Sequence, residues 1–205
     1  RYFPHIVNLA CKAILAAITK MKYIHACNTC PQYAAAVHNP IAIVQSLVQV
    51  ICASSLWCQE FSSILESLGL KDLQLICDVD TRWSSTYLMI ECILELEEGV
   101  KEFIEQNGTE EIQKYKLSDP EWATLKHFKA ILAVPHAFQQ KLPHEKTPTL
   151  CYALPSFEGM MGAWEKLKND NPDLTNIIQA GLDKLEAYHN RTDVVPAYIF
   201  SMSMY

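Results

Sequence analysis

Residues 77–86 read Cys-Asp-Val-Asp-Thr-Arg-Trp-Ser-Ser-Thr, a run in which two acids, an arginine and a tryptophan meet at the start of a helical pattern. Asn107-Gly108 ends that pattern, because this pair is typical of a helix C-terminus. One helix with Asp80 or Thr81 as its N-cap is therefore expected between the two signals. Its apolar stripe consists of Tyr87, Leu88, Ile90, Ile93, Leu94, Leu96, Val100, Phe103 and Ile104.

The segment before this run also has a helical pattern. Residues 5–23 carry a wide apolar stripe that predicts a buried helix, whereas residues 26–38 lack periodicity and predict a loop. Asn39-Pro40 provides an N-cap and a first-turn proline, and one long helix is expected from there to Leu68, just before a glycine. Residues 73–79 alternate, which predicts either a short extended segment or one helical turn.

The C-terminal half continues the helical character. Ser118-Asp119-Pro120-Glu121 matches a capping box, and the helix behind it contains Pro135, which is expected to kink or divide it. A loop is expected at 142–150, with further helices at about 153–169 and 172–188. The prediction is an all-α, mostly helical fold with at most one or two short strands.

Composition excludes several classes of protein. Half of the 205 residues are hydrophobic, which is enough to bury a sizeable core and argues against a disordered chain. Lys and Arg number 17 and Asp and Glu 23, a net charge of −6, so a protein that coats nucleic acid over most of its surface is excluded. No run reaches the roughly 18 apolar residues of a membrane span.

The cysteines are the main alternative source of chemistry. Cys27 and Cys30 have C-x-x-C spacing beside His25 and His38, but this is only half of a zinc site, and a loop with two free thiols is the favoured interpretation. No sequence frame holds a nucleophile against a base. Several cysteines fall within apolar helical patterns, which predicts mostly reduced thiols in an intracellular protein. The chain has eight: Cys11, Cys27, Cys30, Cys52, Cys58, Cys77, Cys92 and Cys151.

The side chains of Arg82 and Trp83 have two open interpretations. An exposed indole beside a guanidinium is a stacking platform for an unpaired base, with the arginine holding a phosphate. Alternatively, Trp83 belongs to the core and Arg82 closes an ion pair with Asp78 or Asp80. Residue chemistry alone favours the second interpretation.

Residues 78–87 resemble the D-x-x-T-R-W-N/S-S block of the hAT superfamily of DNA transposases. Other segments resemble further blocks of that family in the same order along nearly the whole chain. These are residues 1–9 (C-x-x-H-x-x-N-L), Trp122 with its apolar helix, residues 146–150 with 154–155 (T-P-T-L…L-P), residues 183–188 (K-L-x-x-Y) and residues 196–199.

The resemblance implies a ribonuclease-H-like core interrupted by a helical insertion. Residues 1–38 would form the edge of the core and the first helix, 39–190 the insertion domain, and 191–205 a truncated segment returning toward the core. The family's three catalytic acids, which bind a divalent metal such as magnesium, are expected outside this chain. No catalytic residue, metal ligand, cofactor or small-molecule substrate is therefore assigned here, and strand cleavage is not expected of the chain alone.

The resemblance assigns contact with transposon-end DNA to Arg82 and Trp83, with His5, Asp80 and Thr81 as further motif residues. It also implies a nuclear protein that self-associates in its intact form. Tyr2 stands where the family has cysteine, and only three arginines accompany eight cysteines, which indicates a mutated, truncated transposon copy. Two rival hypotheses stay open: a domesticated helical module that binds protein, and a zinc- or redox-active cysteine protein.

Overall fold

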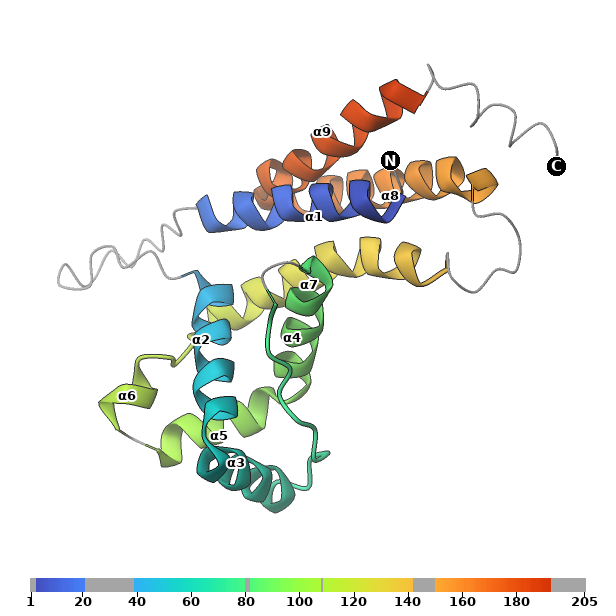
Figure 1. Ribbon diagram of the computed structural model, residues 1–205. Coiled ribbons are helices and arrows are strands. Elements are labelled where there is room, and N and C mark those ends of the chain that lie inside the picture. The colour runs from blue at the N-terminus through green and yellow to red at the C-terminus, as the bar shows by residue number, and fades with distance from the viewer. Residues whose placement is uncertain (1–2, 21–38, 80–81, 108, 142–149, 193–205) are drawn as a thin grey trace, which may run out of the picture. The chain divides into compact units, whose positions relative to one another are not determined.

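The computed structural model describes residues 3–20, 39–79, 82–107, 109–141 and 150–192. These residues form nine α-helices and one short 3-10 helix and contain no strand, which confirms the predicted all-α class (Figure 1). In chain order the elements are α1 Phe3–Lys20, α2 Pro40–Ala53, α3 Ser55–Ser67, α4 Trp83–Glu95, α5 Glu97–Gln106, α6 Glu110–Gln113, α7 Asp119–Lys141, α8 Leu150–Asp170, η3 Pro172–Leu174 and α9 Thr175–Thr192.

The chain divides into two compact units, whose boundary falls within α7. The first unit comprises Arg1–Met21 and Ala130–Tyr205, and the second comprises Lys22–Lys129. This division does not decide which segments belong to a core and which to an insertion. The expected boundaries after residues 38 and 190 therefore stay predictions.

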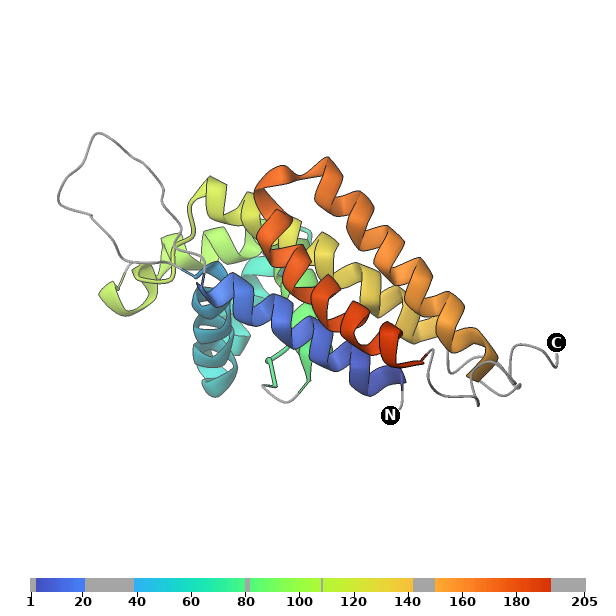
Figure 2. The same ribbon diagram turned by 90° about the horizontal axis from the view of Figure 1, so that it is seen from above.

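In the first unit, α1 lies alongside α9, and α9 also contacts α8 (Figure 2). Gly181 on α9 makes the close approach possible, because a Cβ there would lie 2.7 Å from Ile14 Cδ1 and 3.0 Å from Trp164 Cζ3. Trp164 is fully buried, and its indole N–H donates to the carbonyl of Ile131 at 2.9 Å. Gly181 therefore allows the helices to pack closely, and the buried indole of Trp164 has a hydrogen-bond partner.

In the second unit, the single helix expected over residues 39–68 is wrong, because Ser54 divides it into α2 and α3, bent by 106°. Ser54 has extended backbone angles, and its hydroxyl accepts the N–H of Trp57 as the N-cap of α3. The bend lets α3 pack against α5, where Phe61 and Phe103 meet edge to face at 5.7 Å. Apolar periodicity continues through Ser54 and so did not reveal the break.

The helix predicted from residue 83 to 106 also has an internal break, at the fully buried Leu96. Leu96 ends α4 and starts α5, and Glu97 and Glu98 then occupy the first turn of α5, where acids stabilise the positive end of a helix. Gly99 follows, and a Cβ at this position would clash with the side chain of Leu65 on α3. The acid pair and the glycine were the local signals of a new helix start.

The capping box at Ser118 is confirmed, with a variation in its hydrogen bonds. The Glu121 carboxylate accepts both the backbone N–H and the hydroxyl of Ser118, each at 2.7 Å. The helix that follows, α7, runs without interruption through Pro135, so the predicted division does not occur. Residues 70–79 form neither a strand nor a helical turn but an irregular segment, here called the coil.

Among the described residues, no single helix has the length and apolar character needed to cross a membrane. Only α2 and α3 taken together, as a bent pair, reach that length and composition.

Candidate nucleic-acid interface

The coil passes between α2 and α4, and the carboxylate of Asp78 fastens it to both helices (Figure 1). On the α2 side, Gln45 Nε2 donates to Asp78 Oδ2 at 2.5 Å. On the α4 side, the hydroxyl of Thr86 donates to the same carboxylate, at 3.0 Å from Oδ1 and 3.1 Å from Oδ2. Thr86 is the buried polar side chain of the described core, so this bond satisfies a hydroxyl that water does not reach.

Ser85 completes the connection between the coil and α4. Its hydroxyl lies 2.5 Å from Asp78 Oδ1, 2.7 Å from the carbonyl of Arg82 and 3.0 Å from the carbonyl of Val79. The backbone N–H of Val79 donates to Asp78 Oδ1 and to the Ser85 oxygen, both at 2.8 Å. Asp78, Ser85 and Thr86 therefore form a cluster, called the Asp78 cluster below, that fixes the chain on both sides of Arg82.

Arg82 is the residue that this frame presents to solvent. It is the N-cap residue of α4, it has an extended backbone, and its N–H donates to the carbonyl of Val79 at 2.8 Å. Its side chain is exposed and caps no helix N–H. Among the described residues it has no carboxylate within ion-pair distance, and the first turn of α4 contains no acid. A guanidinium and a helix N-terminus each favour a bound anion.

Trp83, in contrast, lies in the core, with 4% of its surface exposed. The stacking platform that required an exposed indole is therefore wrong, and the alternative interpretation of Trp83 as a core residue is correct. The reason is geometric, because Trp83, Thr86, Tyr87 and Ile90 occupy one face of α4 and are all buried. Trp83 anchors the first turn of the helix and so positions its neighbour Arg82.

The other residues of the predicted motif are His5, Asp80 and Thr81. His5 is exposed on α1, in the first unit. Asp80 and Thr81 lie outside the described residues, as do Cys27 and Cys30. The prediction that Asp80 or Thr81 is the N-cap is wrong, because α4 begins at Trp83 and its N-cap is Arg82. The residues that sequence reasoning missed are Gln45, Ser85 and Thr86. The signal for the last two was a serine and a threonine in the first helical turn, seven and eight residues after an aspartate.

Thiols gather next to the Asp78 cluster, on α2, on the coil and on α4. Burial and a hydrogen bond with Cys77 raise the pKa of Cys52 to about 12, and the nearby thiols of Cys58 and Cys92 act in the same direction. Burial also raises the pKa of Cys92, a core residue of α4. All five cysteines of the described segments are free, and those segments contain no group of three ligands suited to a metal ion.

Ion pairs also connect α5 and α7. Glu97 on α5 accepts from Lys101 at 2.7 Å and pairs with Lys126 of α7 at 3.0 Å. Burial raises the pKa of Glu97, but the hydrogen bonds from the two lysines outweigh it and lower the pKa overall. Beside them, a cavity of about 170 Å³ is lined by Lys101 and Trp122, whose buried indole N–H has no described partner. These contacts join helices to one another and lie apart from Arg82 in the sequence.

A family model, the ZBED1 RNase-like helical domain, matches residues 5–131. No curated protein and no solved structure matches the chain. The matched range covers more than half of the 205 residues and includes α2, the coil, Arg82 and most of α4 to α7. The resemblance to an hAT-type helical region is thus confirmed at the level of the domain: this chain belongs to the family of ZBED1 RNase-like helical domains.

Proposed function

We propose that this helical domain contacts the DNA of a transposon end through Arg82. The observation that carries the proposal is the exposed guanidinium on a fixed backbone: the Asp78 cluster holds the chain before and after Arg82, and the buried Trp83 anchors the helix turn that follows. Because the backbone is already fixed, binding of a phosphate orders only the side chain of Arg82. The family assignment supports the same role, because the motif that includes Arg82 lies inside the matched range.

The charge distribution supports a narrow contact. A chain with a net charge of −6 is a poor polyanion binder over its whole surface, but a single fork of guanidinium donors is sufficient for one phosphate. Asp78, the described acid that lies nearest to Arg82 in the sequence, accepts hydrogen bonds from Gln45, Ser85 and Thr86. The N–H groups of the first turn of α4 add a favourable field for an anion.

The test is a titration of hairpin and flapped oligonucleotides, followed by fluorescence anisotropy, with the wild type and Arg82→Ala. A charge-assisted hydrogen bond contributes about 1.5–3 kcal/mol, so the variant is expected to bind about tenfold or more weakly. The slope of log affinity against log salt should fall by about one. Lys114→Ala is the matched control, because it also removes one exposed positive charge from this unit without touching the site. Equal affinity of Arg82→Ala and wild type removes Arg82 from the proposal.

Trp83 enters the proposal as a positioning residue. Because its indole is buried, Trp83→Ala opens a core cavity and reduces DNA binding through unfolding, whether or not the domain binds a base. Trp83→Phe keeps most of the apolar volume, so the domain should stay folded. Its DNA affinity is therefore expected to lie within about twofold of that of the wild type. A large loss of affinity in a folded Trp83→Phe domain indicates direct contact with the indole.

The wider setting follows from the family and is part of the same proposal. In an intact protein of hAT type, strand cleavage would use a divalent metal such as magnesium. The acids that would bind this metal are expected outside the residues of this chain. Nuclear location and self-association belong to that intact protein. Expression of the intact protein with a fluorescent tag tests the location, and its exclusion from the nucleus contradicts the proposal.

A second candidate function is a protein-interaction module, favoured by the apolar side chains on and after α3. Leu56 is 68% exposed, and Leu68, Ile76 and Val79 are also exposed. The oligonucleotide titration separates the two candidates. A domain that serves only to bind protein gives no saturable DNA binding, and its Arg82→Ala variant behaves as wild type.

A further inference from the structure

The coil runs antiparallel to α2 in a defined register. Gln45 contacts Asp78, and the thiol of Cys52, seven residues further along α2, donates to the carbonyl of Leu75 at 3.7 Å. Seven residues are about two helical turns, so Gln45 and Cys52 lie on the same face of α2. Cys77 therefore crosses this face between the two points of contact. Helical side chains lean toward the helix N-terminus, which tilts the sulfur of Cys52 toward Cys77.

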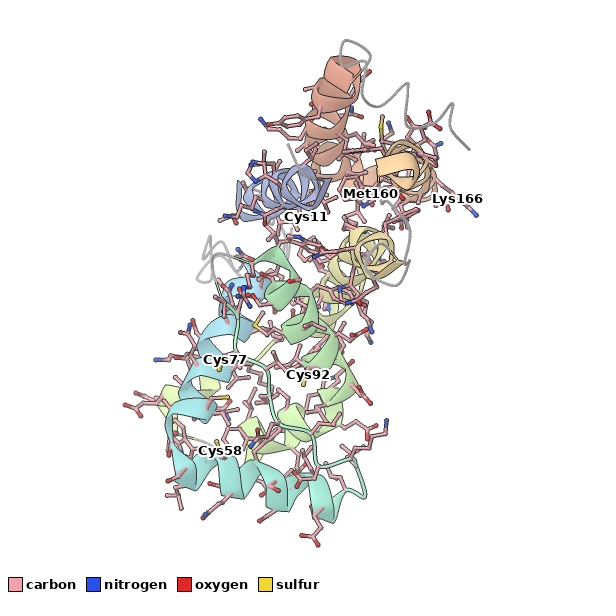
Figure 3. All side chains as sticks on the ribbon, turned by 45° about the vertical axis from the view of Figure 1, so that its right-hand side comes forward. Cys11, Cys58, Cys77, Cys92, Met160 and Lys166 are labelled. Carbon is pink, nitrogen blue, oxygen red and sulfur yellow. The ribbon has the colours of Figure 1, made fainter. Side chains whose placement is uncertain are left out.

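The register places Cys77 beside Cys52, and the Cys77 thiol is close enough to influence the pKa of Cys52. Both residues are exposed. The other thiols nearby have different partners: Cys58 donates to the carbonyl of Ile51 at 3.3 Å, and the buried Cys92 to that of Gln74 at 3.5 Å. Figure 3 shows Cys58, Cys77 and Cys92 in the same part of the second unit. Cys52 and Cys77 thus combine mutual contact with access from solvent.

We propose that Cys52 and Cys77 form a reversible disulfide that fastens the coil to α2 when the protein meets a peroxide. Cys77 loses its proton and attacks the O–O bond, giving a sulfenic acid at Cys77, and the departing hydroxide takes up a proton to become water. The sulfur of Cys52 then displaces hydroxide from Cys77, which leaves as a second water with the Cys52 proton. Two thiols and one peroxide thus become one disulfide and two waters.

The order of the two steps follows from the surroundings of each thiol. Partial desolvation of its sulfur and the neighbouring Cys77 raise the pKa of Cys52 to about 12, so Cys52 stays protonated at neutral pH and reacts slowly with peroxide. Cys77 lies on the exposed coil, and its immediate neighbour is Asp78. A bond at Cys77 therefore fixes the segment that carries the Asp78 cluster. The inference concerns thiol chemistry alone and does not depend on the proposed DNA contact.

The test uses the wild-type chain, reduced, treated with hydrogen peroxide, and digested without reductant for mass spectrometry. Trypsin cleaves after Lys71 and Arg82 and releases residues 72–82, in which Cys77 is the single cysteine. Chymotrypsin cleaves after Trp57 and separates Cys52 from Cys58. The expected product joins Cys52 to Cys77 and disappears on addition of dithiothreitol. It is absent from Cys52→Ser and Cys77→Ser and present at the wild-type level in the matched control Cys58→Ser.

A parallel sample treated in urea shows whether the fold directs the pairing. The proposal expects the Cys52–Cys77 yield to fall severalfold in urea, because the unfolded chain no longer holds the two sulfurs together. Three results overturn it: equal yields in the folded and unfolded chain, pairing of Cys77 mainly with Cys58, or conversion of Cys77 to sulfinic acid without a partner. The wild-type digest answers the question even where a serine variant fails to fold, which circular dichroism detects.

Discussion

Replacement of Asp78 by alanine is expected to destabilise the second unit by about 2–3 kcal/mol. The partners of Asp78 do not contribute equally. Ser85 and the N–H of Val79 each have another hydrogen-bond partner within reach, and Gln45 is partly exposed and can turn to water. Thr86 is different, because only 5% of its surface is exposed and its hydroxyl has no other acceptor among the described residues. An unsatisfied buried hydroxyl costs about 1–3 kcal/mol, and the lost charged bonds add to it.

The assay is urea unfolding followed by tryptophan fluorescence, with Asp72→Ala as the matched control. Asp72 is also an aspartate of the coil, but it is exposed and accepts one bond, from the half-buried Ser62 at 2.9 Å, so its loss should cost less than about 0.5 kcal/mol. A second substitution, Thr86→Val, removes the orphaned hydroxyl and should recover about 1 kcal/mol or more in the Asp78→Ala background. Equal midpoints for Asp78→Ala and Asp72→Ala, or no recovery in the double variant, refute the reasoning.

Three further predictions concern the helix framework. Gly181→Ala should lower stability by about 1–3 kcal/mol, because the added Cβ would clash with Ile14 and Trp164. Gly162 has open space around it, so Gly162→Ala should raise stability by roughly 0.5–1 kcal/mol, and thermal unfolding of the two variants tests the difference. Ser54→Ala removes the N-cap of α3 and should cost about 1 kcal/mol in urea unfolding, and Ser63→Ala on the exposed face of α3 much less. Because the pKa of Glu97 is lowered in the fold, its carboxylate stabilises the protein above the unfolded value of 4.5, and this contribution disappears as the pH falls through the lower folded pKa. The stability difference between wild type and Glu97→Gln should therefore shrink on acidification, and a constant difference contradicts this assignment.

Helix content was predictable because it depends on local periodicity, and the capping box at Ser118 shows how far local rules reach. The two breaks were not predicted, for a shared physical reason. Ser54 and Leu96 interrupt stripes whose apolar spacing continues on both sides, so the hydrophobic pattern alone favours one straight helix. The packing of α3 on α5 selects the bend, because the missing side chain of Gly99 leaves room for Leu65. The packing energy is gained only when both helices are present, so the pattern of one helix does not reveal it.

The sequence left two interpretations of Arg82 and Trp83 open, because burial is a property of the fold. The sequence places a tryptophan beside an arginine, and this pair is compatible both with a stacking platform and with a core anchor. The Asp78 cluster distinguishes them: by fastening the coil to α2 and α4, it fixes the first turn of α4 so that Trp83 faces the core and Arg82 faces solvent. Gln45 lies 33 residues before its partner Asp78, a separation that no local pattern reveals. Substitutions in the cluster should therefore alter the presentation of Arg82 as well as stability, whereas Arg82→Ala should alter DNA affinity alone.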